Sequence, residues 1–201
     1  MPVLGPLSCE LRHRLWRRLR AAWLISSLLL TLLGTERELP AQTPASREYS
    51  VKAVFLFNFA QFVEWPTTAF HEAETPLVIG VLGEDPFGAY LDETVRGEKV
   101  NNRPLVIERY HRVEEIKTCH ILFISRSETD RLEKIFTALK GRNILMVGDS
   151  DRFCGRGGTI RFVTEKNKTR LRVNLEAAKA ANLTISSKLL RPAEIVTPET
   201  D

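Results

Sequence analysis

The 201 residues of the chain, 43% of them hydrophobic and 27% charged, suffice for one domain with a hydrophobic core and are too few for two full domains. Of the 29 basic and 25 acidic side chains, six arginines and three glutamates lie in residues 1–45, which leaves 23 basic and 22 acidic residues elsewhere. This balance does not imply a phosphate-binding surface, so we expect no nucleic-acid partner.

Residues 1–41 have the pattern of an export signal. An arginine-rich run from Arg12 to Arg20 precedes the apolar run AAWLISSLLLTLL, which extends from Ala21 to Leu33. Thirteen helical residues reach about 20 Å, whereas the hydrocarbon of a bilayer is roughly 30 Å thick. We therefore expect a cleaved signal peptide and leader, with an uncleaved anchor as the alternative.

The stretch REYSVKAVFLFNFAQFVEWP, residues 47–66, predicts a long helix that begins near Ser46 and ends at Trp65, before Pro66. At 100° per residue its polar side chains share one arc about 120° wide. These are Ser50, Asn58, Gln61 and Glu64. The rest of the surface is apolar, so the helix should pack against a sheet and neighbouring helices.

Lys52 lies in the middle of the apolar arc of this helix. A lysine one turn from a helix start can extend along its own stem to the solvent, which is the reading we favour. The alternative is a buried lysine that faces a ligand.

Four short apolar runs predict strands buried on both faces. They are LVIGVLG (77–83), PLVIER (104–109), HILFIS (120–125) and NILMVG (143–148). Helical patterns at 86–95 and 128–140 separate some of these strands. Such alternation predicts an α/β fold, with a largely parallel central sheet flanked by helices in a single domain over residues 46–190.

The segments 158–163 and 169–174 alternate polar and apolar residues around a polar turn, which predicts a C-terminal antiparallel hairpin. Its outer face should carry Arg161, Arg170 and Arg172. These arginines either protect a sheet edge or form a docking surface for an acidic partner. Two short helices should follow, the first capped by Asn174, and residues 191–201 should be a flexible tail.

Open α/β sheets bind ligands at the carboxyl ends of their strands, so the loops there are the predicted ligand site. The loop residues in question are Gly83, Asp85, Ser125 and Asp149. Asp149 and Asp151 are too few for a calcium loop and suit turns or caps, so we expect no metal and no cofactor. We find no catalytic constellation and expect no enzyme activity.

Cys119 and Cys154 remain once Cys9 is assigned to the leader. In an exported protein these two thiols could form one disulfide. The sequence leaves open whether they are bonded to each other, free, or joined between chains.

Five segments, in this order, resemble the YfiR-like family of exported bacterial proteins over about residues 48–190. They are YSVKAVFLFNFAQFVEWP, LVIGVLGEDPFG, CHILFIS, GGTIRF and LRVNLEAAKAANLTISSKLL. The resemblance implies a non-catalytic periplasmic α/β domain that inhibits the sensor domain of a membrane-bound diguanylate cyclase. It also implies a homodimer and an outer-membrane-associated lipoprotein as a second partner.

The resemblance extends to the cysteines, with a difference. Cys119 and Cys154 match one cysteine from each of two disulfides of the family's best-known member, but the partner positions, near Ile79 and Arg161, lack cysteine. The redox response of that member is therefore not implied for this chain.

We expect a regulatory protein that docks its partner through aromatic residues such as Trp65 and through Arg161, Arg170 and Arg172. One alternative is a periplasmic small-ligand receptor that uses the strand-end loops. Another is an exported hydrolase with a dispersed site.

Overall fold

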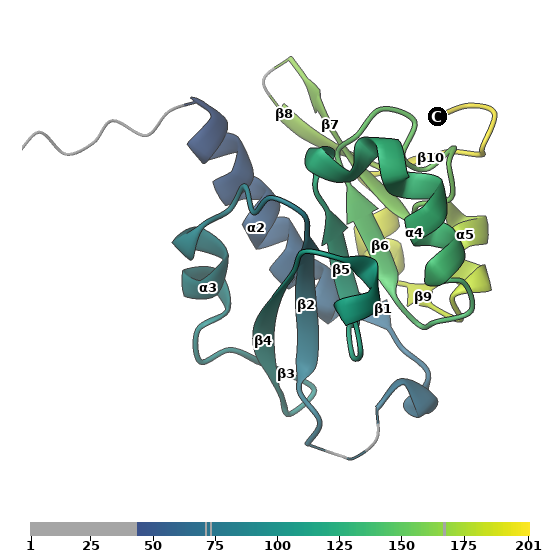
Figure 1. The fold of residues 1–201 in the computed structure, drawn as a ribbon. Coiled ribbons are helices and arrows are strands. Elements are labelled where there is room, and N and C mark those ends of the chain that lie inside the picture. Colours follow the sequence, from purple (N-terminus) through teal and green to yellow (C-terminus); the bar gives the residue numbers. More distant parts are fainter. Residues whose placement is uncertain (1–43, 71, 73, 167) are drawn as a thin grey trace, which may run out of the picture. The chain divides into compact units, whose positions relative to one another are not determined.

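The computed structural model describes residues 44–201 apart from 71, 73 and 167 (Figure 1). The predicted signal peptide and leader, residues 1–41, lie outside the described residues. Within the described part of the chain, no helix is long and apolar enough to cross a membrane.

The centre of the fold is an eight-stranded sheet with the order β10-β8-β7-β6-β5-β2-β4-β3. Its strands are β2 (Leu77–Leu82), β3 (Lys99–Val100), β4 (Arg103–Tyr110), β5 (Ile121–Ile124), β6 (Leu145–Gly148), β7 (Ile160–Glu165), β8 (Lys168–Val173) and β10 (Glu194–Ile195). The five strands from β4 to β7 in this order are mutually parallel, whereas β3 and β8 run antiparallel to their neighbours β4 and β7. This confirms the predicted α/β fold class.

Helices cover both faces of the sheet (Figure 1). On one face lie α2 (Pro44–Phe62), α3 (Ala89–Val95), α5 (Leu175–Ala180) and α6 (Ser187–Leu190). On the other lies α4 (Leu132–Ala138), reached through the 3-10 segment η3 (Arg126–Arg131), together with η2 (Val113–Glu115). β5 is buried on both sides because Phe123 packs with the first group and Leu122 with the second.

The long first helix differs from its prediction at its end. It stops at Phe62 rather than Trp65, because the next two residues form β1 (Val63–Glu64). This strand pairs with β9 (Thr184–Ile185) in a separate two-stranded sheet. A short 3-10 turn, η1 (Thr67–Ala69), follows. The exposed stripe of α2 is also less polar than predicted, since Val51 and Val54 are 43% and 46% exposed.

The predicted hairpin is confirmed as β7 and β8, with Phe162 opposite Leu171 and Arg161 opposite Arg172. The Asn174 cap is also present, since its side chain accepts a hydrogen bond from the backbone of Ala177 at 3.0 Å.

The prediction of a flexible tail at residues 191–201 is wrong. β10 pairs with β8, and the backbone N–H of Val196 donates to Val173 O at 3.0 Å. Val196 is only 4% exposed, and the Asp201 carboxylate accepts hydrogen bonds from the backbone of Cys154 and Gly155. A strand of two residues is too short for its periodicity to be visible in the sequence.

Close packing of Phe153 gives a test of this architecture. Phe153 is fully buried, and its ring lies where a Cβ atom on Gly158 would have to be. We expect Gly158→Ala to lower the free energy of unfolding by about 1–3 kcal/mol, because the core cannot absorb the added methyl group without strain. Urea unfolding measures the change. Phe153→Leu in the same chain should reduce the penalty, and an equal penalty in both backgrounds would contradict this packing.

Candidate functional site

The predicted ligand loops do meet at one edge of the sheet, but their own residues fill the space between them. Gly83, directly after β2, has a φ of +92°, and the position of its missing Cβ is occupied by the side chains of Ser127 and Glu128. Ser127 also accepts a hydrogen bond from the backbone of Glu84 at 3.0 Å. The start of η3 therefore packs onto the loop that follows β2.

Asp85 of the same loop holds α3 in place. Its Oδ1 accepts a hydrogen bond from the backbone of Phe87 at 2.8 Å, and its Oδ2 accepts one from Arg109 Nε at 2.8 Å. Arg109 also donates to Asp92 on α3, and this hydrogen bond lowers the pKa of the Asp92 carboxyl. Asp85 thus belongs to an ion-paired bridge between β4 and α3.

Asp149, directly after β6, is the centre of a buried polar cluster. Its Oδ2 accepts hydrogen bonds from Lys52 Nζ at 2.5 Å and from the Tyr49 hydroxyl at 2.9 Å. Lys52 Nζ also lies 2.7 Å from Glu48 Oε1. The Asp149 side chain is completely buried, and that of Lys52 is 1% exposed. The preferred prediction, that Lys52 reaches the solvent, is therefore wrong.

The electrostatics of this cluster favour a structural role. Burial, followed by the negative charge of Asp149, raises the pKa of Tyr49, so the phenol stays a neutral donor. Lys52 Nζ forms ion pairs with two carboxylates, those of Glu48 and Asp149, and so links α2 to the end of β6. The second oxygen of Asp149 makes no hydrogen bond among the described residues, but it lies 3.3 Å from Arg126 Nε.

Ser125 is 5% exposed and begins η3. Its backbone N–H donates to Leu82 O, and its carbonyl accepts from the N–H of Glu128, both at 3.0 Å. Ser125 therefore joins the carboxyl end of β5 to that of β2. All four predicted ligand-loop residues lie at the expected edge of the sheet, where their contacts are with other parts of the chain.

The two cysteines are free and buried, so the disulfide considered from the sequence is not formed. Cys119 Sγ donates to Ile121 O at the start of β5, whereas Cys154 Sγ contacts the carbonyls of Thr159 and Arg172 beside the hairpin. Burial raises the pKa of both thiols to about 12. Neither cysteine has the lowered pKa of a catalytic nucleophile.

The predicted partner-binding residues are mostly engaged within the chain. Arg161 is 9% exposed and pairs with Asp151 and Asp201, and Arg172 pairs with Glu194 at 3.0 Å. Trp65 is half-buried, with its indole N–H donating to a backbone carbonyl. Of this predicted set, Arg170 alone is exposed.

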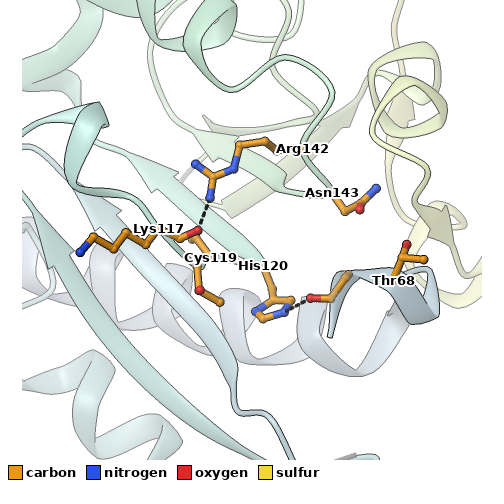
Figure 2. Close-up of a pocket in the computed structure, with 8 residues that line it drawn as sticks. Thr68, Lys117, Cys119, His120, Arg142 and Asn143 are labelled. Atoms are coloured by element: carbon orange, nitrogen blue, oxygen red, sulfur yellow. Dashed lines mark hydrogen bonds between the residues drawn. The ribbon is translucent and has the colours of Figure 1, made fainter. Parts of the chain in front are cut away.

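A cavity of about 200 Å³ opens at the opposite edge of the sheet, before β5 and β6 (Figure 2). It is lined by Thr68, Ala69, Lys117, Thr118, Cys119, His120, Arg142 and Asn143. In Figure 2 the Lys117 side chain points away from His120 and Arg142. Arg142 donates to the carbonyls of Ile116 and Lys117, both at 2.7 Å.

His120 in this cavity is a structural residue. Its Nδ1 accepts from the N–H of Val78 at 3.0 Å, which makes Nε2 the nitrogen that donates to Ala69 O at 3.2 Å. Burial lowers the pKa of His120, so the ring is held neutral with both nitrogens engaged. The arrangement leaves no ring nitrogen for general-base chemistry.

A second cavity, of about 240 Å³, lies between the end of α2 and β3. Its lining includes Trp65, Phe70, Val100 and Arg103. The Arg103 guanidinium lies 3.9 Å from the centre of the Phe70 ring, a cation–π contact. The sequence did not predict either cavity, because turns and short strands far apart in the chain form their walls.

Across the described residues, no group of three or more His, Cys, Asp or Glu side chains could hold a metal ion.

Comparison with known proteins gives one extensive match. The sequence profile of the YfiR/HmsC-like family matches residues 49–194. No curated protein matches the chain. A solved structure, a conserved domain protein from Vibrio cholerae O1 biovar El Tor strain N16961, is similar at 13% identity with a TM-score of 0.44. That similarity covers 60% of this chain and 54% of the other, so the chain spans about half the length of that protein.

The buried ion pair predicts a large effect on stability. Lys52→Met removes the buried counter-charge of the Asp149 carboxylate and leaves only the exposed Arg126 guanidinium beside it, so we expect a loss of about 3–5 kcal/mol in the free energy of unfolding. Glu48→Gln, at a partly exposed carboxylate, should cost about 1 kcal/mol or less. Adding Asp149→Asn to Lys52→Met should restore part of the loss, because a neutral amide needs no counter-charge. Equal losses for Lys52→Met and Glu48→Gln in urea unfolding would contradict the larger contribution of the Lys52–Asp149 pair to stability.

The thiol pKa values predict chemical inertness. In a Cys9→Ser chain at pH 8, Cys119 and Cys154 should not react with Ellman's reagent until denaturant is added, and then both should react. Because their pKa values are raised in the folded state, unfolded thiols ionise first, so their contribution to stability is lost as pH rises above about 9. Rapid labelling of the folded chain would contradict this burial.

Proposed function

Because the chain belongs to the YfiR/HmsC-like family, whose members regulate diguanylate cyclase systems, we propose that it is a non-catalytic regulator of a membrane signalling enzyme. In this proposal it binds the sensor domain of the enzyme, a diguanylate cyclase in the first instance, and inhibits it. The family match over residues 49–194 is the observation that carries the proposal.

The geometry of the strand-end loops supports a regulatory role. A hydrolase or ligand receptor at this edge needs an open crevice with groups free to contact a substrate. Here Asp85 and Asp149 are ion-paired within the chain, and the Gly83 position is packed against η3. The exposed Val51 and Val54 on α2 are instead available to a protein partner.

The location and partners follow from the same proposal. The export pattern of residues 1–41 supports a periplasmic protein, which meets the sensor domain on that side of the inner membrane. An outer-membrane-associated lipoprotein is the proposed second partner, and a homodimer is the proposed assembly.

Crosslinking in living cells tests the proposal. The tagged full chain, crosslinked and purified from membranes, should recover a protein with a diguanylate cyclase or related signalling domain, and its overproduction should lower cyclic-di-GMP. A matched chain without residues 1–41 should do neither, because it is not exported. Repeated recovery of no membrane signalling protein, with cyclic-di-GMP unchanged, would refute the proposal.

A periplasmic small-ligand receptor is the second candidate function. The two cavities of about 200 and 240 Å³ at the amino-terminal edge of the sheet favour it. A ligand that binds the folded chain must raise its melting temperature, so a thermal-shift screen of nucleotides, amino acids and aromatic metabolites tests this candidate. A screen without any stabilising compound would count against it.

A further inference from the structure

The β8 edge of the sheet is covered along only two of its six residues. β10 pairs with β8 at Arg172 and Val173, and within the described part of the chain no strand pairs with Lys168–Leu171 on that side. Four residues of strand extend about 13 Å. An uncovered stretch of this length presents backbone donors and acceptors that an incoming strand can use.

The covered part of the edge shows which kind of segment pairs with β8. Glu194 of β10 lies opposite Arg172, and its Oε2 accepts a hydrogen bond from Arg172 Nε at 3.0 Å. The next residue, Ile195, lies opposite Val173. The segment that pairs with the covered part is thus extended, with an acidic residue opposite an arginine and an apolar residue next to it.

The uncovered part of β8 repeats the pattern of the covered part. Side chains two apart on a strand share a face, so Lys168 and Arg170 continue the row that Arg172 begins. Val173 O accepts from Val196 on the outer side of β8, and the alternation of a strand turns the backbone groups of Thr169 and Leu171 to the same side. Both the charge and the hydrogen-bonding groups therefore extend past the end of β10.

A groove runs alongside these residues. It has a volume of about 270 Å³ and is lined by Phe55, Lys168, Thr169, Arg170, Leu171 and Pro192. Three of these side chains are apolar, two are cationic and none is acidic. Arg170 and Lys168 are exposed at this groove. An acidic segment with apolar side chains complements the groove in both charge and polarity.

We propose that Lys168–Leu171 bind an extended acidic segment of a partner protein, which adds to β8 as an edge strand. The segment carries acidic residues at alternate positions, facing Arg170 and Lys168, and apolar residues between them that enter the groove. This inference deepens the proposed function, on which it rests, by naming the surface through which the partner is recognised.

Lys168 and Arg170 could instead protect the sheet edge, a role that predicts no binding of an added strand. Lysines and arginines on an edge strand can prevent pairing with other chains. In that case an acidic strand would gain nothing at Lys168–Leu171. The two roles therefore differ in whether a short acidic peptide binds there.

NMR titration of the full chain with a synthetic peptide distinguishes them. The probe is the blocked hexapeptide Glu-Val-Glu-Val-Glu-Val, and the comparison peptide replaces each glutamate with lysine. We expect the acidic peptide to shift the amide signals of Thr169 and Leu171, and the basic peptide to leave them unchanged. Thr169→Pro should abolish binding, because it removes an outward N–H while leaving the pairing of β8 with β7 intact.

Charge reversal provides the matched pair of variants. Arg170→Glu should weaken binding of the acidic peptide by roughly fivefold or more, since opposed charges on adjacent strands attract and like charges repel. Arg96→Glu, at an exposed arginine that follows α3, makes the same change in net charge and should leave the affinity unchanged. Equal weakening by both variants would indicate general charge attraction and overturn the proposed site.

Three further outcomes would also overturn the inference. These are no shift at Thr169 and Leu171, shifts confined to another surface, or shifts of the same amides on concentrating the protein without peptide, which would assign the edge to a second copy. The peptide titration needs no membrane partner, so its failure is separate from failure of the crosslinking experiment. Peptide binding without any captured signalling protein would retain the edge site and refute the regulatory proposal.

Discussion

The fold depends on covering α2, a helix that is apolar around most of its circumference. Burial of its aliphatic and aromatic side chains against the sheet is non-directional and does not by itself fix the position of the helix along the strands. The contact between Lys52 and Asp149 can fix this position, because a buried ammonium group must lie within hydrogen-bonding distance of its carboxylate. Phe59 of the same helix stacks on Phe162 of β7, with 5.9 Å between the ring centres. This aromatic contact joins α2 to the hairpin.

The same contact decides what the carboxyl edge of the sheet can do. In open α/β folds this edge usually keeps free polar groups for a ligand. Here the N-terminal turns of α2 bring Tyr49 and Lys52 onto Asp149. The carboxylate that a ligand would contact therefore binds side chains of α2 instead. In the proposed function, recognition of the partner falls to surfaces such as the exposed valines of α2 and the edge of β8.

The sequence predicted the parts of the fold whose patterns are local. Runs such as LVIGVLG identify central strands because burial on both faces removes every polar residue. The alternation in the hairpin identifies its register, with Phe162 opposite Leu171. β1, β3, β9 and β10 were missed because two residues cannot show a period. The sequence placed the loops of the candidate site at the correct edge of the sheet, but it did not predict that their polar residues bind other parts of the chain. Helical periodicity places Lys52 on the apolar face without revealing a carboxylate 97 residues away.

The tail and the hairpin show how a local pattern can conceal a tertiary role. From the sequence, three arginines on an outer strand face suggest edge protection first, with partner binding as the alternative. The structure separates them, since Arg161 and Arg172 are ion-paired with residues of the chain, whereas Arg170 is exposed beside an apolar groove. Asp201 and Glu194 of the tail form ion pairs with Arg161 and Arg172. The pair with Glu194 costs little conformational entropy, because the backbone of β10 is already paired with β8. Arg170 lies two residues before Arg172 on β8, on the same face of the strand, but no residue of the tail lies opposite it in the register. A strand that continued the line of β10 would place a residue opposite Arg170.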